Sequence, residues 1–212
     1  MNRRDRLATK QPYGPGASAQ GRASGEIIVP VQRRLVSQPD GTTTTEISLN
    51  LQEIPIPERR YVADVAWVDH QDETVRFIFA QKALVGEKLR SVVMVSVYPE
   101  PARQLIAHSH DFMKGISDFL ERNDIKCREV SPPSEEPSQT VALTANMMSV
   151  TFAGREAEWD FFHLPPSGLR KLAERSDVVV DPVVRIDLNT STVAAVLRAL
   201  ERLLPKLPRE AK

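Results

Sequence analysis

Hydrophobic and polar positions recur in the same order in two long stretches of this chain. Residues 63–81 (ADVAWVDHQDETVRFIFAQ) and 145–163 (ANMMSVTFAGREAEWDFFH) align without a gap, and the second lies 82 positions after the first. Each contains an apolar run, a polar turn and an alternating run, which is the pattern of a β-hairpin. Aromatic residues hold matching places, since Phe77 corresponds to Trp159. The pattern predicts a duplicated unit.

A third apolar run and a helical pattern follow in each unit. The third runs are VVMVSV from Val92 and VVRIDL from Val183. After the first of them, two prolines open a stretch with apolar residues at helical spacing, and we expect one helix that ends near Asn123. A second stripe of helical spacing covers residues 193–203. The predicted unit is therefore β-β-β-α, present twice.

Composition divides the rest of the chain. The first residues are rich in Arg, Gly, Ala, Ser and Pro, with almost no large apolar groups, so we expect a disordered tail. Two alternating runs then flank Pro39-Asp40-Gly41, a favourable turn sequence, and predict a hairpin. The predicted organisation is, in order, a disordered tail (1–25), an N-terminal β-hairpin (26–57), repeat one (58–127), a Pro/Ser/Glu-rich linker (128–140) and repeat two (141–212).

The fold class that these elements predict is α+β, an antiparallel sheet from two β-β-β-α repeats with helices packed on one face and an N-terminal hairpin. The second strand of repeat one places Ile78 and Ala80 on its more polar side, so that side is expected to touch something other than water. A sheet of this kind also leaves edges that must be covered or paired. We therefore expect a homodimer or higher oligomer.

Four segments of repeat one carry a resemblance to a known family: Tyr61 with Ala63, FIFAQ from Phe77, RSVVM from Arg90 and PARQL from Pro101. Over about 45 residues these segments resemble an uncharacterised bacterial family, known only as a domain of unknown function. The family usually has Gly where Ala80 stands. The resemblance implies the β-β-β-α unit and no activity, and the Ala/Arg/Val-rich composition indicates a bacterial source.

The order of strands before a long helix is also similar to that of SecB-type export chaperones. The subunits of those chaperones pair through their sheets and offer apolar grooves to unfolded chains. The similarity is one of architecture and implies a holdase only by analogy.

Charge and cysteine content exclude several classes of function. The chain has 212 residues, with 28 basic and 28 acidic side chains, so it lacks the positive excess that nucleic-acid binding normally needs. Its single cysteine, Cys127, can form neither an intrachain disulfide nor a cysteine-based metal site. No apolar stretch approaches the roughly 18 residues that span a bilayer, and no signal peptide is recognised. We expect a cytoplasmic protein without a membrane partner.

One short cluster has the residue types of a metal site, His108-Ser109-His110-Asp111. On a continuous helix, residues two apart point about 200° from each other, so His108 and His110 cannot share an ion, whereas one of them with Asp111 could. We favour the simpler interpretation that all three face solvent. No nucleophile, phosphate-binding loop or cofactor motif is recognised, so no cofactor is expected.

The predicted function is that of a non-enzymatic protein-binding or assembly protein, acting as an oligomer through sheet edges or a groove between helices. The candidate interface side chains are Trp67, Ile78, Trp159 and Phe161. Two alternatives stay open. One is a SecB-like holdase chaperone, and the other is a metal-dependent enzyme centred on His108, His110 and Asp111.

Overall fold

The computed structural model describes residues 28–37, 43–49, 54, 56–82, 89–127, 140–172 and 177–207. The predicted tail, and the predicted linker except for Thr140, lie outside these residues. The described part mixes helices with sheets in which antiparallel pairs dominate, so the predicted α+β class is confirmed.

The N-terminal hairpin consists of β1 (Ile28–Ser37) and β2 (Thr43–Leu49). The next elements are β3 (Arg60–Val62), β4 (Val65–Gln71), β5 (Thr74–Lys82), β6 (Leu89–Val97), α1 (Pro99–His108) and α2 (His110–Arg122). The chain continues with β7 (Val141–Thr144), β8 (Met147–Ala153), β9 (Glu156–His163), α3 (Pro166–Lys171), β10 (Asp177–Val179), β11 (Asp181–Asn189), α4 (Thr190–Leu203) and a 3₁₀ turn (Leu204–Lys206).

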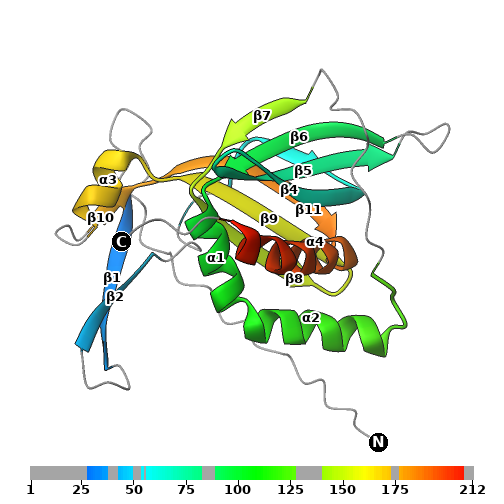
Figure 1. Ribbon diagram of the computed structural model, residues 1–212, viewed down its shortest axis with the longest axis horizontal. Helices are drawn as coiled ribbons and strands as arrows, with labels where there is room; N and C mark the ends of the chain where they lie inside the picture. The colour runs from blue at the N-terminus through cyan, green and yellow to red at the C-terminus, as the bar shows by residue number, and fades with distance from the viewer. Residues whose placement is uncertain are drawn as a thin grey trace, which may run out of the picture.

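The strands of the two predicted repeats form two sheets rather than one (Figure 1). The first sheet has the order β4-β5-β6-β7, and the second sheet has the order β3-β11-β9-β8. The hairpin strands form a separate sheet of order β10-β1-β2. In each four-stranded sheet, three strands are antiparallel neighbours, and a short edge strand runs parallel to the strand beside it.

The short leading strand of repeat one belongs to the second sheet. β3 pairs in parallel with β11, and the amide of Ala63 donates to the carbonyl of Asp187 at 2.9 Å. The next amide, that of Asp64, donates instead to Ala80 of the first sheet, also at 2.9 Å. The chain therefore passes from one sheet to the other between two neighbouring residues. The stretch from Tyr61 to Val68 therefore contains parts of two strands, β3 and β4, that belong to different sheets.

The leading strand of repeat two makes the reverse crossing. β7 pairs in parallel with β6 of the first sheet, and the amide of Ala145 donates to Ser96 there at 3.0 Å. The amide of Asn146 then donates to Phe162 of the second sheet, again at 3.0 Å. Each half of the chain thus lends a strand to the sheet of the other half.

The helix predicted after β6 is broken in two at Ser109. This residue has φ −91° and ψ 1°, and its buried hydroxyl donates to the carbonyl of Ile106 at 2.9 Å. A serine that bonds to nearby backbone competes with the helical hydrogen-bond pattern, which accounts for the break. The prediction of a single helix is wrong, whereas its predicted end near Asn123 is confirmed, because Asn123 is the C-cap of α2.

The main core lies where the two sheets face each other. Phe77 and Phe79 of β5 meet Trp159 and Phe161 of β9, and the ring centroids are 5.1 to 6.2 Å apart across the two sheets. All four side chains are fully buried. The helices α1, α2 and α4 gather on one side of this core (Figure 1), with α4 in contact with β4 and α1 in contact with β8.

The turn of each central hairpin contains one residue with positive φ, Asp72 at 52° and Gly154 at 66°. Glycine reaches this region without strain, whereas a side chain there costs about 1 kcal/mol or more. We expect Gly154→Ala to lower the free energy of unfolding by about 1 kcal/mol in chemical denaturation. Gly115→Ala is the matched control, because its new Cβ would meet Phe152 at an ordinary 3.6 Å and α2 would gain helix propensity. Equal losses in both variants would contradict this account.

Candidate functional site

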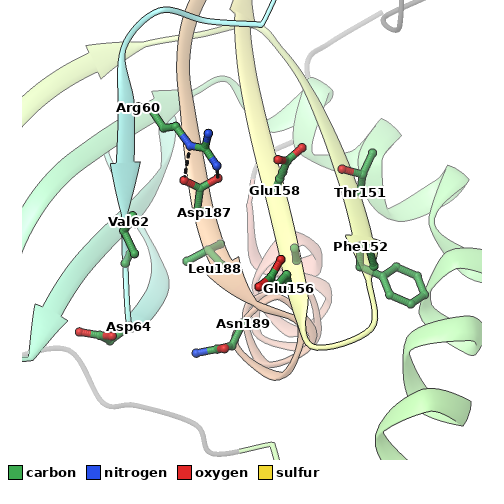
Figure 2. A pocket seen from close by; sticks show the side chains of 13 residues that line it. Arg60, Val62, Asp64, Thr151, Phe152, Glu156, Glu158, Asp187, Leu188 and Asn189 are labelled. Atoms are coloured by element: carbon green, nitrogen blue, oxygen red, sulfur yellow. Dashed lines mark hydrogen bonds and ion pairs between the residues drawn. The ribbon is translucent and has the colours of Figure 1, made fainter.

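A cavity of about 530 Å³ opens on the second sheet (Figure 2). All four strands of that sheet, and the residues just beyond their ends, contribute to it. The lining residues are Arg60, Val62, Ala63, Asp64, Thr151, Phe152, Ala153, Glu156, Ala157, Glu158, Asp187, Leu188 and Asn189. Because side chains alternate along a strand, the polar members project from the face opposite the aromatic core.

Arg60 and Asp187 form the ion pair at the wall of the cavity. Figure 2 shows the guanidinium reaching from β3 to the carboxylate on β11, where Nη2 donates to Oδ1 at 3.0 Å and Nε donates to Oδ2. The hydrogen bond to Asp187, followed by the charge of that carboxylate, raises the pKa of Arg60. The side chain of Arg60 is 58% exposed, so the pair is accessible to a ligand and contributes little to stability.

A second arginine connects the middle strands of the same face. The guanidinium of Arg185 donates to both oxygens of Asp160, at 2.7 and 2.6 Å, and lies 2.9 Å from the carboxylate of Glu158. The hydrogen bond to Asp160 is the main cause that raises the pKa of Arg185. Both arginines therefore stay charged at any pH near neutrality.

The lining of the cavity is mainly acidic. Its titratable side chains are four carboxylates and the paired guanidinium of Arg60, and the described lining residues include no histidine, cysteine, lysine or serine. The excess of carboxylates favours a positively charged side chain in the cavity.

The outer strands of the two sheets differ in what lies against them. The outer strand β4 is in contact with α4, and the outer strand β8 is in contact with α1. The other two outer strands, β7 and β3, each carry an exposed valine. Val141 on β7 is 41% exposed and Val62 on β3 is 58% exposed. The carbonyl of Val62 already accepts a hydrogen bond from Gln81 Nε2 at 2.8 Å.

The three candidate metal ligands lie at the break between α1 and α2. His108 ends α1, His110 begins α2 and Asp111 stands in its first turn, and all three are exposed. His108 Nδ1 lies 2.8 Å from the carbonyl of Gln104. Within the described residues, no group of three or more His, Cys, Asp or Glu side chains could hold a metal ion.

The candidate interface side chains are all buried in the structure. Trp159 and Phe161 are fully buried between the two sheets. Trp67 and Ile78 are 6% exposed and pack with Val65 on the opposite face of the first sheet. The ion-paired arginines of the second sheet were not among the residues that the sequence singled out.

Comparison with protein-family models, with curated proteins and with solved structures finds no match for this chain. The resemblance of residues 61–105 to an uncharacterised bacterial family therefore stays a prediction. None of the helices in the described part of the chain has the length and apolarity that crossing a bilayer requires.

Proposed function

We propose that this chain is a non-enzymatic protein-binding or assembly protein that acts in the cytoplasm as a homo-oligomer and engages other chains through its sheet edges. The observation that carries the proposal is the contrast between the outer strands. β4 and β8 have helices against them, whereas β7 and β3 expose a valine each. The edge of an outer strand offers backbone donors and acceptors to any extended segment.

Of these two outer strands, β7 is the better site for a partner. The Val62 carbonyl on β3 is occupied by Gln81, and no corresponding side-chain bond closes the described residues Val141–Thr144. Three of the four residues of β7 are exposed. An extended segment of a partner protein that pairs with β7 would widen the first sheet to five strands.

Substituting Val141 by lysine tests this edge, because a lysine on an edge strand opposes the addition of another strand. We expect Val141→Lys to lose most of the specific partner that the wild-type chain captures from its native host, as measured by pull-down with quantitative mass spectrometry. Val62→Lys is the matched control, because it places the same charge at an exposed valine of the other outer strand, β3. We expect this variant to keep the partner. Equal recovery with both variants contradicts the use of β7, and a wild-type chain that is monomeric and captures nothing contradicts the proposed function.

The two alternatives gain no support from the described residues. A holdase needs a broad apolar groove, but the exposed large apolar side chains come from separate strands and connections: Ile28, Leu35, Ile56, Val62, Tyr98 and Val141. The metal-dependent enzyme needs ligands that converge, and the exposed His108, His110 and Asp111 do not form such a group. Elemental analysis of the purified protein distinguishes the enzyme directly, since it would contain stoichiometric metal.

A further inference from the structure

The hairpin of β1 and β2 extends from the rest of the molecule as a two-stranded arm (Figure 1). Its base is fixed to the body, because Ile28–Pro30 pair with β10 and Val29 is fully buried. Arg33 Nη2 also donates to the carbonyl of Leu172 at 3.0 Å. Closer to the tip, Leu35 is 74% exposed.

Two strands alone are marginally stable in water and need a third strand or a covered face. β2 is the outer strand of its sheet, and within the described residues its outer edge has no strand beside it. Its seven residues, TTTEISL, are rich in β-branched types and contain no proline, lysine or bulge; Glu46 is the one charged residue among them. Among the described residues, the arm therefore presents an edge of full strand length with no strand paired to it.

We propose that this edge pairs with the same edge of a second copy of the chain. This inference rests on the proposed function and names the surface through which the homo-oligomer forms. Antiparallel pairing of the two β2 strands about a twofold axis gives a four-stranded sheet of order β1-β2-β2-β1, and such twofold contacts are the commonest in oligomers. The β2 strand of a second copy is already extended, so it loses less conformational entropy on pairing than an unfolded peptide does.

The charges on the arm favour pairing through β2 rather than through β1. Arg33 and Arg34 both stand on β1. In the proposed order the two β1 strands are separated by three inter-strand spacings, about 14 Å, which exceeds the screening length of about 8 Å at physiological salt. Pairing through β1 would instead bring four arginines together. The described residues Thr43, Thr45 and Ser48 on β2 are exposed and uncharged. The one charged residue of β2, Glu46, stands opposite Arg34 in the register of the hairpin, so the position directly across from it carries a charge of opposite sign.

A lysine at the centre of β2 tests the proposal in the full-length protein. In a twofold pair, Thr45→Lys places like charges across the new contact, which is destabilising. We expect sedimentation velocity to show a dimer for the wild-type chain and a dissociation constant about tenfold higher or more for Thr45→Lys. Gln32→Lys adds the same charge to exposed β1 and is expected to leave the dissociation constant unchanged.

Cysteine cross-linking locates the contact independently. In a Cys127→Ser background, single cysteines replace Thr43, Thr45 or Ser48, since residues directly opposite in paired strands come within disulfide reach. We expect oxidation to cross-link Thr45→Cys most strongly, because Thr45 lies nearest the middle of the strand. A dimer that persists in Thr45→Lys and cross-links at none of the three positions overturns pairing through the arm and leaves the proposed function standing. A monomeric wild-type chain with no captured partner contradicts the proposed function itself.

Discussion

Replacing Trp159 by alanine is expected to lower the free energy of unfolding by about 3–5 kcal/mol. Trp159 is fully buried between the two sheets. The centroid of its ring lies 5.1 Å from that of Phe77 and 5.8 Å from that of Phe161, on which it stacks. Removing the indole leaves a cavity that the surrounding sheets can fill only in part, so both transfer energy and packing contacts are lost. Urea denaturation followed by circular dichroism measures the change.

Trp159→Phe is the matched control for this prediction. The indole Nε1 is buried and has no hydrogen-bond partner within the described residues, so phenylalanine keeps an aromatic ring and removes an unsatisfied donor. We expect this variant to lose less than half of what Trp159→Ala loses. The double variant with Phe77→Ala is expected to show a coupling of about 0.5–1.5 kcal/mol, as for other aromatic pairs. A loss in Trp159→Ala that does not exceed that in Trp159→Phe would show that the aromatic cluster does not hold the sheets together.

The central hairpins could be predicted from the sequence because their signals are local. Alternation of apolar and polar residues sets the faces of a strand, and a short polar segment between two such runs sets the turn. β4 begins at Val65 and β8 at Met147, positions that correspond in the two aligned stretches. The pairs Phe77–Trp159 and Phe79–Phe161 were matched by alignment, and the structure brings both pairs into contact. That the halves arose by duplication stays an interpretation.

The exchange of leading strands could not be predicted, because β3 and β7 are three and four residues long and too short to show a period. The ion pairs of the second sheet depend on the same long-range information. Arg185 alternates with core residues on β11, and Asp160 does so on β9, which marks both as outward-facing. Their pairing follows only once β9 and β11 are known to be neighbours, and a 3-residue strand and a helix separate them in the sequence.

Expressed as two separate chains, residues 26–127 and 141–212, neither half is expected to fold alone, and the two together are expected to form a folded 1:1 complex. The reason is that each half contributes its short leading strand to the sheet of the other half. β3 of the first half pairs with β11, β7 of the second half pairs with β6, and α4 and α1 pack against strands of the opposite half. A half on its own would expose the aromatic face of its sheet, at a cost of about 25 cal/mol for each Å² left in water.

Separation also removes the effective concentration that a tether supplies, which is in the millimolar range for linked modules. At about 1 μM of each half, the complex is therefore expected to be about 4 kcal/mol less stable than the intact chain and to dissociate on dilution. Circular dichroism of each half and of the mixture, with size-exclusion chromatography, measures both effects. The control is the intact chain with a protease site between residues 127 and 141, examined before and after cleavage. Cooperative unfolding of either half as a monomer would show that the exchanged strands are dispensable. A folded homodimer of the first half would show that a second copy of that half can take the place of the second half.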